Sequence, residues 1–275
     1  MTEFTLNEEL AQRLLTVVDA GLSDGLGRPS PGEMCVEAAI GYACGMPFGD
    51  RPTCVGSSVR QLSVELNDET FWNDEKSRAA GMRRLAVAQL GSNTINQIDF
   101  VRKVTVRLIT KVLPKSLRGL SRLLTDSVKV TVLHTAAESL EQASEDLDQL
   151  RRQLKQTRKT IEALFDISDD SIYNGEGDAD AKTVATGLGE LHFARESVHA
   201  AIKSTPAFVD QYLLAAVTNL EGAVDFLGQA SPDGEQFICE MVEHVVQVLI
   251  ELKSPGCEYL YLTETKGEPV EPVTS

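Results

Sequence analysis

The sequence from Ser30 to Ser92 reads SPGEMCVEAAIGYACGMPFGDRPTCVGSSVRQLSVELNDETFWNDEKSRAAGMRRLAVAQLGS, and it carries the densest helix start and stop signals of the chain. Its first four residues, Ser30 to Glu33, have the order of a capping box, with proline at the first helical position. The residues that follow are apolar on nearly every side as far as Cys44, and Gly45 and Pro47 then provide a stop. This pattern predicts a helix that is buried on several sides.

Two more helices are expected within the same segment, over about 55–66 and about 75–90. Asn67-Asp68 breaks the first, Asn73 or Asp74 caps the second, and Gly91 ends it. All three helices are rich in apolar residues at helical spacing, so they predict a compact helical domain.

Three blocks of the chain, PGEMCVEAAIGYACGMPFGDRPTCV, RRLAVAQLGS and PGCEYLYL, lie within residues 25–126 and 235–262. Together they resemble a family of uncharacterised bacterial and phage proteins that share PGxMCxEAA…GDxPxCV, RxLAxAQLGS and C-terminal PGCxxLxL blocks. The resemblance implies a helical protein that is often carried by mobile elements. It implies no particular activity.

A chain of 275 residues can bury about 75% of its unfolded surface, so one large or two small domains are expected. No apolar run reaches the roughly 20 residues that span a membrane, and the polar, acidic N-terminus does not have the pattern of a signal peptide. Five cysteines without CxxC spacing indicate reduced thiols in a cytoplasmic protein.

The net charge of −15 is unevenly distributed along the chain. Residues 1–125 carry a net charge of +1, whereas the remainder carries −16. The acidic second part should repel nucleic acid and anionic membranes, and it suits either solubility or a basic partner.

A seven-residue repeat follows the first domain, with Leu133, Leu140, Leu147, Leu154 and Ile161 at one position. A second set lies three residues further on in each repeat, and it comprises Ala136, Ala143, Leu150, Thr157 and Leu164. This repeat predicts one long coiled-coil-like helix over about 126–165.

The repeat, the acidic linker over 166–180 and three later helices together predict an acidic helical bundle over 127–262. The last of those helices is a candidate to pack back on the first domain, because the family-like blocks occur at both ends of the chain. A short extended segment is expected over 257–262 and a disordered tail over 263–275. The predicted class is therefore all-α, with a compact helical domain over 1–126 followed by this bundle.

A basic series lies between the two predicted domains, and no acidic residue occurs between Phe100 and Thr125. One interpretation is a stripe that binds phosphates or carboxylates, including those of a nucleic acid or nucleotide; the other is a face that pairs with the acidic second part. The lack of interleaved aromatic residues favours the second interpretation. The series comprises Lys103, Arg107, Lys111, Lys115, Arg118 and Arg122.

His192, Glu196 and His199 occur at i, i+4 and i+7 of one predicted helix. Glu196 and His199 match half of a carboxylate-bridged di-metal signature, but the chain has no second half. The three residues also lie away from the predicted core face of their helix. The pattern therefore favours a structural role, and no metal or other cofactor is expected.

Cys35 and Glu37 are the candidates for catalysis. A helix N-terminus lowers the pKa of a thiol, so Cys35 with Glu37 and a histidine would suit a cysteine-dependent hydrolase or transferase. The apolar neighbours of Cys35 favour an inert buried thiol instead. If Glu37 is buried it needs a partner, and Arg83 and Arg84 are the nearest candidates in sequence.

The leading functional hypothesis is a non-enzymatic helical interaction or scaffold protein, associated with phage or other mobile elements. It rests on the heptad repeat, the acidic surface and the absence of a complete catalytic motif. The expected partner is a protein or a second copy of the chain, bound through the helical bundle. Thiol chemistry at Cys35 and nucleic-acid binding by the basic series are the alternatives.

Overall fold

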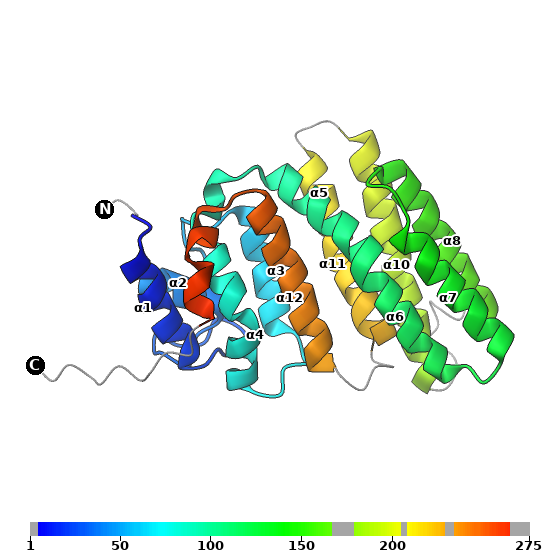
Figure 1. The fold of residues 1–275 in the computed structure, drawn as a ribbon, viewed down its shortest axis with the longest axis horizontal. Coiled ribbons are helices and arrows are strands. Elements are labelled where there is room, and N and C mark those ends of the chain that lie inside the picture. Colours follow the sequence, from blue (N-terminus) through cyan, green and yellow to red (C-terminus); the bar gives the residue numbers. More distant parts are fainter. Residues whose placement is uncertain (1–4, 167–178, 205–207, 229–233, 265–275) are drawn as a thin grey trace, which may run out of the picture. The chain divides into compact units, whose positions relative to one another are not determined.

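The computed structural model describes residues 5–166, 179–204, 208–228 and 234–264, and these form eleven α-helices without a strand (Figure 1). The predicted all-α class is therefore confirmed. The chain divides into unit 1, which comprises residues 1–95 and 249–275, and unit 2, which comprises residues 96–248. The boundary predicted at residue 126 thus differs from the observed division, which assigns residues 96–126 to the second unit. Most of the predicted linker over 166–180 and of the predicted tail over 263–275 lies outside the described residues.

Unit 1 is built from short helices with side-chain caps. Asn7 accepts a hydrogen bond from the Leu10 amide (2.8 Å) at the start of α1, and Asp74 and Ser77 form a capping box at the start of α4. Helix α4 packs against α1, α2 and α3. The helices of the unit are α1 (Glu8–Asp19), α2 (Val36–Ala43), α3 (Ser57–Asp68), α4 (Glu75–Ala88) and the 3₁₀ helices η1 (Ser92–Thr94) and η5 (Pro255–Thr263).

The capping box predicted at Ser30 is wrong, because α2 begins only at Val36. Gly32 has a φ of +89°, which belongs to a turn and not to a helix. The segment before α2 is instead held by an isolated bridge from Gly27 to Met34. The Asn67 side chain completes the N-terminus of α2 from a distance in sequence, by accepting from the Val36 amide at 3.1 Å.

The C-terminal segment after α12 forms the 3₁₀ helix η5, so the extended segment predicted over 257–262 is wrong. It packs on α4 and α1. The Gly256 amide donates to the Leu90 carbonyl at 2.8 Å, and the Ser254 hydroxyl donates to the Ala88 carbonyl at 2.7 Å. These bonds use backbone carbonyls at the end of α4. They hold the segment against the end of that helix, so the segment does not adopt an extended conformation.

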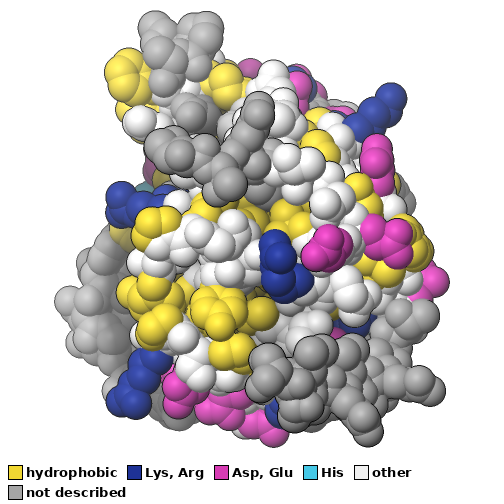
Figure 2. All heavy atoms as spheres, turned by 90° about the vertical axis from the view of Figure 1, so that its left-hand side faces the viewer, with side chains coloured by type: hydrophobic (Ala, Val, Ile, Leu, Met, Phe, Trp, Pro, Cys, Tyr) yellow, Lys and Arg dark blue, Asp and Glu magenta, His cyan; other side chains and the backbone are white. Residues whose placement is uncertain are grey.

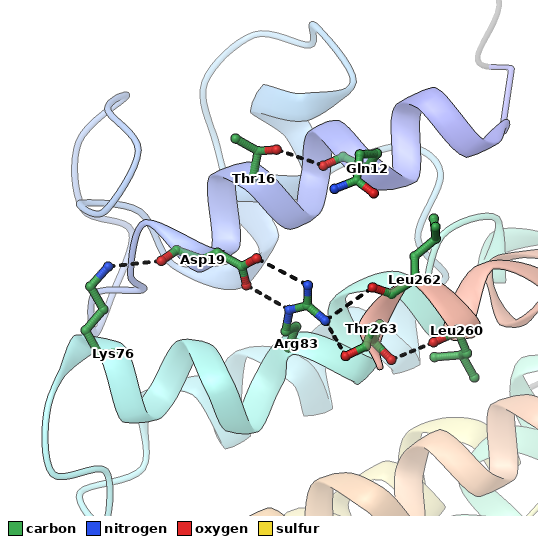
Figure 3. A network of polar contacts seen from close by, with 8 residues as sticks. All are labelled: Gln12, Thr16, Asp19, Lys76, Arg83, Leu260, Leu262 and Thr263. Carbon is green, nitrogen blue, oxygen red and sulfur yellow. Dashed lines mark hydrogen bonds and ion pairs between the residues drawn. The ribbon is translucent and has the colours of Figure 1, made fainter. Parts of the chain in front are cut away.

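Arg83 of α4 forms hydrogen bonds with both the end of α1 and the end of η5 (Figure 3). Its guanidinium donates to the Asp19 carboxylate at 2.8 and 3.2 Å, and also to the carbonyls of Leu262 and Thr263. Lys76 adds a bond to the Asp19 carbonyl at 3.0 Å. A single arginine therefore fastens the end of η5 to the end of α1.

Unit 2 contains the longer helices. Its first part runs without interruption through α5 (Gln97–Arg107), the π-helix η2 (Leu108–Val112) and α6 (Leu113–Leu120), and the 3₁₀ helix η3 (Ser121–Leu123) follows. Pro114 lies in the first turn of α6 and does not separate two helices, because the wider π turn before it absorbs the missing N–H. The remaining helices are α7 (Ser127–Glu141), α8 (Leu147–Phe165), α10 (Ala179–Lys203), α11 (Val209–Gly228) and most of α12 (Gly234–Glu251).

The single long helix predicted over 126–165 is wrong, because the heptad repeat is divided between α7 and α8. Asp146 caps α8 by accepting from the Gln149 amide at 2.8 Å, and the chain turns between the two helices. Lys129 near the start of α7 donates to the Leu164 carbonyl near the end of α8 at 2.8 Å, so the two helices run antiparallel. The apolar repeat is nevertheless real in each half: Leu133, Leu140, Leu150, Leu154 and Ile161 are all fully buried.

Candidate ligand pocket of unit 1

A pocket of about 1050 Å³ lies in unit 1 between α1, the end of α2 and the loop that follows α2. Gly45 ends α2 with a φ of +68°, and the Met46 amide donates to the Gly41 carbonyl at 2.9 Å. The chain then passes around the pocket before it enters α3. We call residues 44–54 the pocket loop; residues 44–53 line the pocket with Thr5, Leu10, Arg13 and Gly41.

Hydrophobic and charged side chains share this part of the molecule. Figure 2 looks onto the α1 side and shows a group of hydrophobic side chains next to separate basic and acidic ones. Phe48 of the pocket loop is 40% exposed and supplies an apolar wall that solvent reaches. A pocket of this size and mixed character is typical of sites for small organic molecules.

Arg13 is the positive charge best fixed at the pocket. Its Nε donates to the Ala43 carbonyl at 2.6 Å, which places the guanidinium at the C-terminus of α2, where a cation is favoured. Arg51 and Asp50 are the other charged groups of the lining, and they lie 3.9 Å apart. The lining therefore carries an excess positive charge.

Cys44 and Cys54 meet at the two ends of the pocket loop, with their Sγ atoms 4.0 Å apart. Cys44 is half-buried and lines the pocket, whereas Cys54 is buried. The hydrogen bond with Cys54 lowers the pKa of Cys44, burial opposes this change, and the charge of Arg13 adds to it. The same contact and burial raise the pKa of Cys54. Within this pair, Cys44 is therefore the thiol that should ionise first.

Glu37 is a fully buried carboxyl group on the same stripe of α2 as Gly41 and Cys44, at i, i+4 and i+7. Burial raises its pKa to about 8. The Ser63 side chain, the charge of Arg60 and the Gln89 side chain lower this pKa, but by less than burial raises it. Neither of its oxygens has a hydrogen-bond partner within the described part of the chain. Glu37 is therefore largely protonated at neutral pH.

Arg83, one of the two candidate partners predicted for Glu37, pairs with Asp19 instead, and Arg60 of α3 is a cation that acts on Glu37. Cys35 is not in the second turn of its helix but caps it: its Sγ accepts from the Ala38 amide at 3.5 Å. Only 2% of Cys35 is exposed, and burial raises its pKa to about 11. The sequence of unit 1 also contains no histidine. These observations oppose the catalytic role considered for Cys35.

The basic series is spread over α5, η2, α6 and η3 of unit 2. Two of its members pair with the acidic part of the chain: Arg118 binds the Glu141 carboxylate through two nitrogens at 2.7 and 2.8 Å, and Lys115 pairs with Glu240. Burial, and then the charges of Arg107 and Lys115, lower the pKa of His244. Lys111 and Arg122 are exposed, whereas Lys103 and Arg107 are half-buried. The contacts of Arg118 and Lys115 favour the interpretation in which the series pairs with acidic residues.

His192, Glu196 and His199 are not brought together as a metal site. The His192 Nδ1 lies 2.8 Å from an Arg158 nitrogen, and Glu196 pairs with Arg195. No cluster of three or more potential metal-ligating side chains occurs among the residues that the structure describes. No helix within the same described ranges is long and apolar enough to cross a membrane.

No protein-family model, curated protein or solved structure matches the chain. The resemblance inferred from the three sequence blocks therefore stays a prediction. The candidate site is therefore inferred from geometry alone. The sequence did not predict its main residues, which are Arg13, Cys44 and Cys54. The sequence places Cys44 and Cys54 at the two ends of a segment with two glycines and two prolines, but this spacing alone does not show that they meet.

Proposed function

We propose that unit 1 binds a small organic anion in its pocket, and that the ligand lies against the Cys44 thiol. The observation that carries this proposal is the shared wall of the pocket, where the Arg13 guanidinium and the half-buried Cys44 both line the same space of about 1050 Å³. The charge of Arg13 attracts an anion, and the apolar side chains of the pocket loop favour an organic body.

The side chains that line the pocket favour one class of ligand, an anion with an apolar body. Within the described part of the chain Arg13 donates to the Ala43 carbonyl through its Nε, and its two terminal nitrogens can bind a carboxylate or sulfonate. Phe48, Met46 and Leu10 can cover an apolar portion of the same molecule. The buried Glu37, one turn before Gly41 on α2, has a pKa raised to about 8 and adds little negative charge near the pocket at neutral pH, so it opposes a bound anion little.

The fluorescent anion 8-anilinonaphthalene-1-sulfonate tests this proposal, because it combines a sulfonate with an aromatic body. We expect saturable binding to the folded chain, weakened roughly tenfold by Arg13→Gln, since one charge-assisted hydrogen-bonding group is lost. Arg28→Gln removes an exposed arginine outside the pocket and should leave binding unchanged.

Gly41→Phe provides a second variant that fills the pocket. Among the described residues outside its own helix, a Cβ at Gly41 would meet only the Gly49 carbonyl oxygen at 3.6 Å, an ordinary contact, so the larger side chain can extend into the pocket. Binding should be lost in this variant while its circular dichroism matches that of the wild type. Equal binding by the wild type and Gly41→Phe would remove the proposal.

A second candidate function is the helical interaction role predicted from the sequence. It is favoured by the outer face of the α7–α8 hairpin, where Val128 is 69% and Val132 is 41% exposed. A hollow of about 300 Å³ lies beside Val132, and small side chains such as Ala136 and Ser139 line it. A partner helix, from another protein or a second copy, could approach closely there.

The hairpin face can be tested with Val132→Asp, which puts a charge on the proposed contact without touching the core. If the chain self-associates through this face, sedimentation equilibrium should show weaker association of the variant. Lys129→Asp would break the bond to Leu164 and is unsuitable as a control, whereas Glu138→Gln changes an exposed side chain that does not line the hollow. A wild type that stays monomeric would leave only a different protein as the partner, to be sought by cross-linking.

We place both functions in the cytoplasm, as the cysteine content of the chain predicts. All five cysteines are free thiols in the structure, which is consistent with a reducing compartment. The association with mobile elements rests on the sequence resemblance alone.

A further inference from the structure

The two thiols at the ends of the pocket loop are close enough to react with one another. Their Sγ atoms are 4.0 Å apart, and a disulfide requires about 2 Å, so a small shift of the loop would join them. Among the described residues, a Cβ added at Gly45 or at Gly49 would meet no atom within 4 Å, so the loop is not closely packed at these two positions. Both glycines lie between the two cysteines.

The two thiols differ in access and in character. Cys44 reaches the pocket, while Cys54 is 1% exposed and lies behind it. Arg13 is near enough to Cys44 for its charge to favour the thiolate. An accessible attacking thiol with a second thiol close behind it allows a mixed disulfide with a bound substrate to be resolved within the same chain.

We propose that Cys44 and Cys54 form a reactive dithiol that reduces a low-molecular-weight disulfide of a peptide thiol, such as oxidised glutathione, held in the pocket of unit 1. This inference rests on the proposed function for the pocket and names the class of ligand. A peptide disulfide carries carboxylates that Arg13 can bind, and the volume of the pocket lies at the upper end of the range for small-ligand sites.

The reaction proceeds in two exchanges. The Cys44 thiolate attacks one sulfur of the bound disulfide, the disulfide bond breaks, and the first small thiol leaves as a thiolate that takes up a proton. Once Cys44 is in the mixed disulfide it no longer raises the pKa of Cys54, so Cys54 loses its proton and attacks the Cys44 sulfur as a thiolate. The second small thiol leaves as a thiolate and takes up that proton. Two electrons pass from the dithiol to the substrate, and the products are a Cys44–Cys54 disulfide and two small thiols.

Mass spectrometry of the intact full-length chain after incubation with oxidised glutathione tests the proposal. The wild type should lose two hydrogen atoms and gain no lasting adduct, and peptide mapping should place the new bond between Cys44 and Cys54. Cys54→Ser should instead retain one glutathione on Cys44, because the second exchange is blocked. Cys44→Ser should retain none on Cys54, which is buried.

Cys257→Ser is the matched control, since Cys257 is a half-buried thiol of the same unit outside the pocket. It should behave as the wild type does, and Cys44 in Cys54→Ser should react about tenfold faster than Cys257. Adducts on Cys257 or Cys239 without a Cys44–Cys54 bond would overturn the inference. If the Cys44–Cys54 disulfide forms but the chain does not bind 8-anilinonaphthalene-1-sulfonate, the proposal of a reactive dithiol is supported and the proposal of an anion pocket is rejected.

Discussion

Glu37 is a buried carboxyl group whose ionisation opposes the folding of unit 1. Its pKa of about 8 in the folded chain lies above its ordinary value of 4.5, so the folded state binds the proton more tightly than the unfolded state does. The free energy of unfolding should therefore fall as the pH rises from about 4.5 to about 8, and become independent of Glu37 above that range. The physical cause is burial, which penalises the ionised carboxylate.

Glu37→Gln should flatten this pH dependence and raise the free energy of unfolding at pH 8 by about 2–5 kcal/mol. Urea melts of the wild type and the variant at several pH values measure the difference. Glu33→Gln changes an exposed carboxylate four residues earlier and should keep the wild-type slope. A wild-type stability that does not fall between pH 5 and 8 would show that Glu37 is not buried in its uncharged form.

Gly256 marks the closest approach of η5 to the end of α4. A Cβ at this position would overlap the Val87 carbonyl oxygen, which is backbone and cannot turn away. Gly256→Ala should therefore cost about 2–4 kcal/mol in the free energy of unfolding. Gly119→Ala is the opposite case: nothing lies within 4 Å of a Cβ there, and alanine should stabilise α6 by about 0.5–1 kcal/mol. Thermal melts that rank the two variants in the reverse order would contradict the packing of η5.

At the scale of elements, the α7–α8 hairpin shows what the apolar repeat could and could not predict. The buried stripe was predictable, because each helix buries one face at the same spacing whether or not the two are continuous. The turn was not, because the repeat continues in register across residues 142–146. Asp146 was the available signal, as a capping residue placed just before Leu147.

Because the repeat forms a hairpin, two of its leucines should contribute differently to the free energy of unfolding. Leu147 is the first residue of α8 and half-buried, so Leu147→Ala should cost only about 1 kcal/mol. Leu154 is fully buried in the middle of α8, so Leu154→Ala should cost about 2–5 kcal/mol. Urea melts distinguish them; equal losses in the two variants would favour a continuous helix over the hairpin.

The pocket loop is the second element for which sequence reasoning was incomplete. Its glycines and prolines predicted only that α2 would stop. The meeting of Cys44 and Cys54 depends on the path of the loop back to α3, and the position of Arg13 depends on the packing of α1 against α2. Neither is encoded in local spacing.

If the dithiol is oxidised, the bond closes the pocket loop and should stabilise unit 1 by about 2–3 kcal/mol, as expected for a loop of this length. Melts of the chain before and after treatment with oxidised glutathione measure this gain. Cys44→Ser, which cannot form the bond, should show no gain. A loss of stability on oxidation of the wild type would mean that the bond strains the loop.

At the scale of the whole molecule, the helical class was predictable from periodicity and caps, whereas the location of the candidate site was not. The helix-start pattern in the sequence indicated Cys35 as the candidate thiol. In the structure the buried Cys35 sulfur caps the backbone of α2. The reactive candidate is Cys44, nine residues further along the same segment. Tertiary contacts decide between these thiols, since burial raises the pKa of one while Cys54 and Arg13 lower that of the other.

The rate of alkylation of each cysteine by iodoacetamide, measured by peptide mass spectrometry on the folded chain at neutral pH, tests this central claim most directly. Cys44 should react first, ahead of the half-buried Cys239 and Cys257, whose pKa values are raised by burial. Cys35 and Cys54 should react only after unfolding. If Cys44 reacts no faster than Cys257, or only in denaturant, the pocket has no activated thiol and the account of unit 1 is contradicted.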